Sequence, residues 1–476
     1  MDPLEFNKSV NHKQNNGEVH SAMIPLVKNR GWWPINSLSS HQLSSKRHSS
    51  PLSPNHCQPN QTLTPSRRYI FKSFKMTNAT WDYDGLRVTM TSTFDWRWSD
   101  SGSGGKRNGT FFHPRAQGNL CALGSYGNPA YGEITGKKSV ILVGPSPNAP
   151  AGRSPAVARP TSYTNMWSDG GSGGDNDGTM WRPVAPSGYV AMGDVIASGY
   201  GKQPSVNDVW CLRSDLTRLS TYEASDFWND GSSGADRNCS TWKIVTETNG
   251  IDGSEYLPIP PYTFRVSPNY GRPDTSYAVV PLLRVPNAFK RFDFALPTVT
   301  KKTIPSTGDQ FGQQEQCSAV LPFIFYLPND SAWNLARISK PFYTVSREIA
   351  WNVEGVWNND SAGDFNRSKT IKWGISKTQS EEMVHSAGVS VSASYGIKGF
   401  ESSVTLNYQF TQTTSKSFTE YQEGETTESF VVPGKTVKVL FSKHIWLKAK
   451  AGDGTMASQV EMVANNDIHF GGCDLS

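Results

Sequence analysis

Three stretches of the sequence combine tryptophan, aspartate, serine and glycine in a way that could bind a carbohydrate. They begin at Trp98, Trp167 and Trp228, and the second one reads WSDGGSGGDNDGTMW. Counted from each tryptophan, position +2 is aspartate, +5 is serine, +6 is glycine and +14 is aromatic. An aromatic ring can stack on the apolar face of a sugar, and a carboxylate can accept hydrogen bonds from its hydroxyl groups. The repeated set therefore predicts a site for a glycan or another receptor group.

A structural role for the same residues is the alternative. The aspartate can accept backbone N–H bonds across a turn, the glycine can supply a positive φ, and the aromatic residues can hold the loop against a sheet. From the residues alone, both the structural staple and the binding site stay open. The candidate receptor- or glycan-binding residues are Trp98, Asp100, Trp167, Asp169, Trp181, Trp228, Asp230 and Trp242.

The acidic side chains of the second and third stretches raise the alternative of a calcium site, because calcium takes oxygen ligands. The first stretch does not fit, since it has Lys106 at the corresponding position, and the spacing matches no EF-hand. We therefore expect no cofactor, with calcium as the alternative. The candidate metal ligands are Asp169, Asp175 and Asp177, and the corresponding set in the third stretch is Asp230, Asp236 and Asn238.

No group of residues predicts catalysis. Of the nine histidines, five lie within residues 1–78, and the other four are single residues in unlike contexts. The stretch GEITGKKS at 132–139 lacks the glycine spacing of a phosphate-binding loop, and Lys138 stands where Ser or Thr would hold magnesium. We therefore expect that the protein is not an enzyme.

The elements that carry the three stretches are predicted to be β-strands. The 476 residues include 42 Gly and 30 Pro, with 11% aromatic and only 18% charged residues, which favours a turn-rich, all-β fold. From Trp98 to Trp167 is 69 residues and from Trp167 to Trp228 is 61, so each unit has room for several short strands. The first two units also share a glycine at +26, Gly124 and Gly193. Three such units predict a pseudo-threefold β-prism over residues 79–290.

Residues 1–78 differ in composition from the rest of the chain. They hold 10 Lys/Arg and 3 Asp/Glu, a local charge of +7, which leaves 36 basic against 38 acidic residues elsewhere. The remainder is thus nearly neutral, which argues against a nucleic-acid partner. We expect residues 1–78 to form a disordered basic leader. It is compatible with an organelle transit peptide, a flexible tail or translation from Met76, whereas it lacks the apolar stretch of a secretory signal.

A different pattern occupies residues 386–415, where apolar residues alternate with Ser, Thr, Asn and Gln in two arms joined by a turn. Each arm has about nine residues, close to the length of a tilted transmembrane β-strand. The only charged residues, Lys398 and Glu401, lie at the turn, and a polar but uncharged face suits a wet pore. The alternative is an ordinary hairpin of a β-sandwich. The candidate membrane-insertion residues are Val389, Val391, Ala393, Tyr395, Ile397, Phe400, Val404, Leu406, Tyr408 and Phe410.

Two resemblances add to these patterns. The stretch DGTMWRPVAPSGYVAMGDVIASGYGKQPSVNDVWCLRSDL at 177–216 resembles the signature of the Vps62-type family. Residues 369–399 and 429–449 resemble, in pattern, the elongated β-module of aerolysin-like pore-forming proteins, including insecticidal ones. Together the resemblances imply a Vps62-like β-prism at 79–290 followed by an aerolysin-like module at 291–476. The Vps62 name does not fix the function, because members of this group also occur fused to pore-forming modules.

These observations lead us to expect a β-pore-forming protein of the toxin or defence type, soluble when made. It would bind a cell-surface receptor or glycan and insert hairpins into the lipid membrane as a barrel. A lone hairpin leaves backbone polar groups unpaired in lipid, so insertion requires a homo-oligomer. The alternative is a lectin or a vacuolar-sorting-type binding protein that forms no pore. The residues do not identify the receptor, the target organism or the oligomer number.

Overall fold

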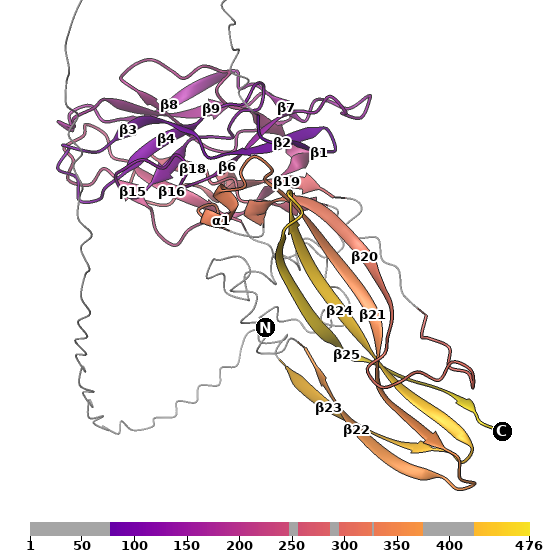
Figure 1. The fold of residues 1–476 in the computed structure, drawn as a ribbon. Helices are drawn as coiled ribbons and strands as arrows, with labels where there is room; N and C mark the ends of the chain where they lie inside the picture. Colours follow the sequence, from indigo (N-terminus) through magenta and orange to yellow (C-terminus); the bar gives the residue numbers. More distant parts are fainter. Residues whose placement is uncertain (1–76, 247–255, 286–294, 326–327, 375–422) are drawn as a thin grey trace, which may run out of the picture. The chain divides into compact units, whose positions relative to one another are not determined.

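The computed structural model describes residues 77–246, 256–285, 295–325, 328–374 and 423–476. All of them belong to one compact unit, Ser73–Ser476. Figure 1 shows that strands dominate this unit, and α1 (Ala332–Leu335) is a single short turn of α-helix. The all-β prediction is therefore confirmed. No helix in the described ranges is long and apolar enough to cross a membrane. In the described residues, 3₁₀ helices occur at Ser214–Leu216, Thr275–Tyr277 and Phe323–Phe325.

Within the described part of residues 79–285, six small antiparallel sheets occur as three pairs, one pair for each repeat. The first pair is β1 (Trp81–Tyr83), β2 (Leu86–Thr91) and β6 (Val140–Pro145) with β3 (Phe94–Ser99), β4 (Thr110–Pro114) and β5 (Tyr126–Asn128). The second is β7 (Val157–Ala158), β10 (Tyr189–Val190) and β12 (Cys211–Arg213) with β8 (Ser162–Ser168), β9 (Gly178–Val184) and β11 (Val195–Ser198). The third is β13 (Thr217–Leu219), β17 (Tyr256–Pro258) and β19 (Val279–Arg284) with β14 (Thr221–Tyr222), β15 (Trp228–Asn229), β16 (Ser240–Val245) and β18 (Phe264–Ser267).

The three pairs share one register, as the repeat predicts. The strand before each loop pairs with the strand after it through positions +1 and +12: Ser99 with Thr110, Ser168 with Thr179, and Asn229 with Ser240. A third strand then pairs with the strand after the loop in every unit. The loop-bearing sheets thus repeat one pairing pattern three times, whereas the companion sheet of the first unit, β1-β2-β6, differs in strand order from β7-β12-β10 and β13-β19-β17. The closed prism geometry itself stays a prediction.

The three units approach each other closely at the glycines that the first two share. A Cβ atom added to Gly124 would lie 2.8 Å from the Cα of Gly193, and one added to Gly193 would lie 2.5 Å from the Cβ of Thr263. Thr263 occupies the corresponding position of the third unit, one residue before β18. Glycine at +26 therefore serves close packing between units, and the one larger residue fills the space that two glycines leave.

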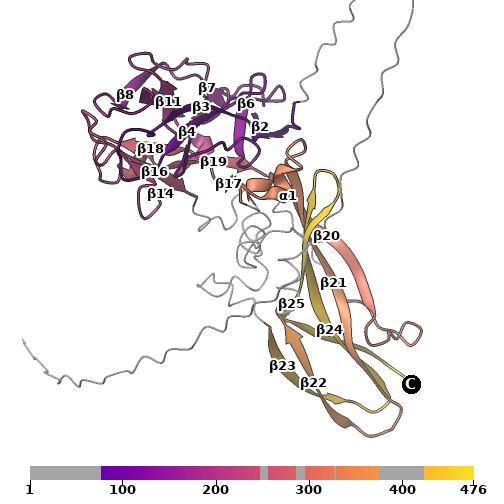
Figure 2. The ribbon, with the colours of Figure 1, turned by 60° about the vertical axis from the view of Figure 1, so that its left-hand side comes forward.

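The C-terminal part contains much longer strands (Figures 1 and 2). β20 (Gln310–Pro322), β21 (Phe342–Asn359), β24 (Thr436–Ala451) and β25 (Met456–Asp474) form one antiparallel sheet in the order β20-β21-β24-β25. β22 (Phe365–Trp373) and β23 (Gly424–Val432) form a separate two-stranded sheet. The alternating Val, Ile, Trp and polar residues of these strands agree with their half-buried position.

A large buried cluster joins the two parts of this unit. It includes Leu86 and Leu257 from the small sheets together with Leu321, Val345 and Ile445 from the long sheet. The predicted boundary near residue 290 falls in the range 286–294, outside the described residues. Residues 1–76 of the predicted leader and the predicted insertion hairpin also lie outside the described residues, so these domain assignments stay predictions. Asn78, the last residue of the predicted leader, is described and hydrogen-bonds to Gln117 and Met90.

Candidate functional site: a ring of three loops

The three repeated tryptophans pack against one another. Trp98, Trp167 and Trp228 are each 1% exposed, and their ring centroids are 5.2–5.5 Å apart in edge-to-face arrangements. Edge-to-face contact is a preferred geometry for aromatic pairs. A register shift precedes Trp98 in β3 and Trp167 in β8, and such a bulge redirects the side chain that follows it. Local strand irregularity thus turns Trp98 and Trp167 toward the centre that they share with Trp228.

Each indole N–H donates to the next loop in a cyclic order. The Nε1 atom of Trp98 lies 2.9 Å from Oδ2 of Asp169 in the second loop. Trp167 donates to the carbonyl of Arg237 in the third loop at 2.7 Å. Trp228 closes the cycle by donating to Oδ2 of Asp100 in the first loop at 3.0 Å. The buried indoles are therefore satisfied as donors, as buried polar groups require.

The repeated aspartates close each loop from inside. Oδ1 of Asp100, Asp169 and Asp230 accepts the backbone N–H of the residue nine positions later, at 2.9, 2.9 and 2.8 Å. The repeated glycine at +6 has a φ between +69° and +79° in all three loops, which confirms the predicted positive φ. Burial raises the pKa of Asp230, although the backbone N–H of Cys239 works against that shift. These contacts are those of a structural staple.

Backbone hydrogen bonds join the three loops into a closed ring. The N–H at position +8 of each loop donates to the carbonyl at +3 of another: Asp175 to Ser101, Asp236 to Gly170, and Lys106 to Gly231. The N···O distances are 2.8, 2.8 and 3.2 Å. Because the main chain makes this contact, Lys106 keeps the ring closed although it breaks the acidic pattern of the side chains.

The predicted binding residues are therefore brought together, but not at a surface. Trp98, Trp167, Trp228, Trp181 and Trp242 are at most 8% exposed, and Asp100, Asp169 and Asp230 at most 3%. A sugar cannot stack on a ring that is covered by other side chains. Burial thus favours the structural alternative for these eight residues over direct binding.

The calcium alternative finds little support in the same loops. Asp169 uses one carboxylate oxygen for Gly178 and the other for Trp98, and Asp175 accepts a hydrogen bond from Ser101 at 2.7 Å. In the described part of the chain, no group of three or more His, Cys, Asp or Glu is arranged to hold a metal ion. Asp169, Asp175 and Asp177 thus do not form a shared coordination site in this structure.

Three tyrosines that were not predicted from the sequence lie at the rim of the ring. Tyr131, Tyr200 and Tyr270 are 48%, 49% and 48% exposed, and each is followed by glycine. Their hydroxyl groups contact the repeated aspartates Asp100, Asp169 and Asp230, respectively. The signal was present in the sequence as a Tyr-Gly pair in every unit. It was obscured because the offset from the tryptophan is 33, 33 and then 42 residues.

Burial and the neighbouring carboxylate hold these phenols in their protonated form. Burial of the hydroxyl, together with its hydrogen bond to Asp100, raises the pKa of Tyr131 to about 12. The same two causes raise the pKa of Tyr200 beside Asp169, and burial with the charge of Asp230 raises that of Tyr270. Each hydroxyl thus lies next to a buried carboxylate, while about half of the tyrosine surface is exposed.

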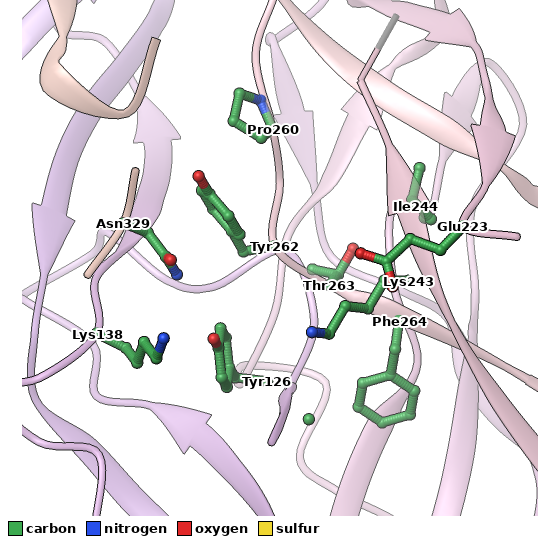
Figure 3. A pocket seen from close by; sticks show the side chains of 11 residues that line it. Tyr126, Lys138, Glu223, Lys243, Ile244, Pro260, Tyr262, Thr263, Phe264 and Asn329 are labelled. Carbon is green, nitrogen blue, oxygen red and sulfur yellow. The ribbon is translucent and has the colours of Figure 1, made fainter. Parts of the chain in front are cut away.

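A small pocket elsewhere provides a second candidate site (Figure 3). It has a volume of about 180 Å³, and its polar lining includes Tyr126, Lys138, Glu223, Lys243 and Asn329. Figure 3 shows the amino groups of Lys138 and Lys243 directed into this space from opposite sides. Lys138 is already paired with Asp330 at 2.7 Å. The volume is below the roughly 300 Å³ at which ligand pockets begin, so the pocket suits water or a small anion.

The ten predicted insertion residues, Val389 to Phe410, lie outside the described residues. The strands on either side of them are described. β22 ends at Trp373, which is the register partner of Gly424 at the start of β23. The chain therefore leaves and re-enters the described structure at neighbouring positions.

Comparison with protein families gives one match. Residues 70–275 match the model of vacuolar protein sorting-associated protein 62. The matched range contains all three loops of the ring, and it confirms the resemblance drawn from residues 177–216. Comparison with the curated proteins found no match.

Solved structures with similarity to the chain resemble it only weakly. GNIP1Aa from Chromobacterium piscinae is 22% identical with a TM-score of 0.33, and the match covers 40% of this chain and 35% of that one. Cry35Ab1 is 9% identical with a TM-score of 0.30, over 67% of this chain and 89% of that one. The hemolytic lectin CEL-III is 11% identical with a TM-score of 0.13, over 83% and 93%. The chain thus spans about a third of GNIP1Aa, and TM-scores this low assign neither fold nor function.

Proposed function

We propose that the protein attaches to a cell-surface glycan or receptor, assembles with copies of itself and inserts β-hairpins into the membrane as a pore. The observation that carries the proposal is the position of the alternating, charge-poor segment 386–415 between paired strand ends. Since Trp373 and Gly424 are register partners, the intervening chain can extend β22 and β23 as one antiparallel hairpin. Hairpins from several copies can then close into a barrel without free edges.

The strands that lead to this segment suit such an extension. Nine of the 18 residues of β22 and β23 are exposed, and the Thr370 and Thr427 hydroxyl groups meet across the pair at 2.8 Å. The exposed residues include Ser368, Thr370, Thr427 and Ser429, which match the Ser- and Thr-rich face of residues 386–415, together with the charged Arg367, Lys372 and Glu425. A continuous ribbon with one polar face is what a water-filled barrel needs. The proposed role involves no catalytic step.

We assign attachment to the ring of loops. The buried aspartates and tryptophans hold the three loops together, and exposed side chains line the rim of the ring that they form. The specific observation that favours the alternative, a lectin without a pore, is the same rim: exposed tyrosines at three equivalent positions can serve binding alone. The two functions differ in what happens after attachment.

Dye release tests the proposal. Vesicles made from target-cell lipid extracts and loaded with a self-quenching dye are mixed with the full chain, before and after limited proteolysis. We expect release that rises steeply with protein concentration, because assembly precedes insertion. Binding to the vesicles without release under any of these conditions would favour the lectin. A variant with Leu406→Lys should bind and release no dye.

A further inference from the structure

The rim tyrosines share a local environment in all three units. Each hydroxyl lies beside a buried aspartate that belongs to the staple, and Tyr270 donates to Oδ1 of Asn238 at 3.2 Å. Position +10 of every loop is an exposed amide or carboxylate: Asn108, Asp177 and Asn238. The Tyr200 hydroxyl contacts Asp177, the equivalent of Asn238. In the second and third units the tyrosine therefore has the polar side chain at +10 as a neighbour, and Asn108 occupies the equivalent sequence position in the first unit.

The arrangement leaves each ring ready for stacking. A half-exposed tyrosine normally loses side-chain freedom on binding, at a cost of about 0.5–1.5 kcal/mol. Here the hydroxyl of Tyr270 already donates to Asn238 at 3.2 Å, and the aspartates beside the three hydroxyls are at most 3% exposed and bonded to the loop backbone. Tyrosine offers a large, rigid contact surface at a small entropy cost even without such support. The rim is thus preorganised for a flat ligand face.

The surroundings favour a sugar over a protein partner. Protein interfaces need a contiguous apolar centre from which water is excluded. The exposed residues at +8 to +10 of the three loops are instead all polar or charged: Lys106, Arg107 and Asn108 in the first loop, Asp175, Asn176 and Asp177 in the second, and Asp236, Arg237 and Asn238 in the third. One aromatic face beside amide and carboxylate groups matches the alternation of apolar face and hydroxyl edge in a pyranose ring.

We propose that Tyr131, Tyr200 and Tyr270 form three equivalent carbohydrate subsites, each completed by the polar residue at position +10 of its loop. The inference rests on the proposed attachment of the protein to a cell surface and names the side chains that carry it. Single subsites of this size bind weakly, and three on one ring gain strength from simultaneous contact. Such avidity can exceed the single-site affinity by about 10²–10⁴-fold on a dense glycan surface.

A glycan array probed with the full chain tests the subsites. Wild type is compared with the three single Tyr→Ala variants, the triple Tyr131→Ala/Tyr200→Ala/Tyr270→Ala variant and the matching triple Tyr→Phe variant. Trp96→Ala is the control, because Trp96 is also an exposed aromatic residue, at 42%, away from the rim. Near-UV circular dichroism and thermal melting verify that all variants are folded.

We expect each single variant to lose about tenfold in apparent affinity for the glycans that wild type binds, and the triple alanine variant to lose all binding. The triple phenylalanine variant keeps the rings and should lose only a few-fold, whereas Trp96→Ala should bind like wild type. Equal binding by wild type and the triple alanine variant would overturn the inference. So would cell binding by wild type that survives glycosidase treatment of the cells and is lost after protease treatment.

Failure of the subsites and failure of the proposed function give different results. Dye release from glycan-free vesicles is therefore measured with both wild type and the triple alanine variant at high protein concentration. If wild type binds no glycan but still permeabilises these vesicles, the carbohydrate subsites are wrong and the pore stands. If glycan binding depends on the tyrosines but no condition gives release, the subsites stand and the pore is wrong.

Discussion

At the residue scale, one aspartate in each loop performs several tasks. Asp169 is 1% exposed, accepts the backbone N–H of Gly178 at 2.9 Å and the indole N–H of Trp98 at 2.9 Å, and also contacts the exposed Tyr200. A single side chain thus links loop closure, packing between units and the orientation of a surface ring. Asp177, an exposed residue of the same loop, accepts neither of these two hydrogen bonds.

Asp169→Ala should therefore lower the free energy of unfolding by roughly 1–3 kcal/mol, because it leaves buried donors without an acceptor. Asp177→Ala, the matched control, should change it by less than about 0.5 kcal/mol, as exposed substitutions usually do. Urea unfolding measures both. Normal stability of Asp169→Ala combined with lost surface binding would instead assign Asp169 to the binding site and reject the staple.

His113 gives a second residue-scale prediction. It is 6% exposed, with Nδ1 3.0 Å from the Ser125 hydroxyl and Nε2 3.3 Å from the carbonyl of Asp208. Burial, assisted by the charge of Arg97, lowers the pKa of His113 from 6.5 to about 4. Between these two values the unfolded chain binds a proton that the folded chain does not. The free energy of unfolding should therefore fall as the pH drops from 6.5 to 4, by a total on the order of 3 kcal/mol.

Unfolding of wild type and His113→Gln at several pH values between 7 and 4 isolates this contribution, because other acid-sensitive groups are common to both proteins. The difference in stability should change with pH across the window and level off above 6.5. A difference that stays constant from pH 7 to 4 would show that His113 is not held neutral in the fold.

At the scale of elements, the long sheet contains a cross-strand group of opposite charges. His444 on β24 lies 2.7 Å from Glu461 on β25 through Nδ1, and 3.6 Å from Glu354 on β21 through Nε2. Glu354 occupies the register shift between Val353 and Gly355, and such a bulge can aim a side chain at a partner outside the regular pattern. Lys369 on β22 adds its charge near Glu354. Three strands of the sheet are thus joined by one ionisable group.

The stability of the long sheet should depend on pH in the opposite direction from His113. Burial lowers the pKa of His444, but Glu354 and Glu461 outweigh burial, and the pKa is raised above 6.5. The contribution of this group is then fully present below pH 6.5 and is lost as the pH rises through the raised pKa. His444→Gln should remove a decline in stability that wild type shows between pH 6.5 and alkaline pH. Parallel stability curves for the two proteins over this range would contradict the assignment.

At the scale of the whole molecule, the sequence predicted the all-β class, the repeated register and the positive φ of Gly104, Gly173 and Gly234. It left open whether the tryptophans are buried staples or exposed binding residues. The acceptors of the three indoles come from other loops, 71, 70 and 128 residues away in the chain, so local composition could not decide between the two. The rim tyrosines were missed because the third unit has a longer insertion before Tyr270. Features that follow a periodic sequence pattern could thus be predicted, whereas contacts between the three units could not.

The buried cluster shared by the small sheets and the long sheet affects how function is tested. Leu86 and Leu321 belong to the same cluster, and both are at most 1% exposed. Cutting the chain near residue 290 would expose this apolar surface to water. Binding and membrane activity are therefore best compared in the full chain, where substitutions in one part report on that part alone.

Planar-bilayer recording of Leu406→Lys and Asn407→Lys tests the central claim, membrane insertion by residues 386–415, most directly. Alternation places these neighbours on opposite faces, with Leu406 toward lipid and Asn407 toward the lumen. Lysine at a lipid-facing midplane position costs roughly 2–4 kcal/mol per strand, whereas a lumenal lysine stays in water. With both variants folded, we predict no conductance from Leu406→Lys and pores shifted toward anion selectivity from Asn407→Lys. Equal conductance from the two, or none from wild type before and after limited proteolysis, would contradict insertion of this segment.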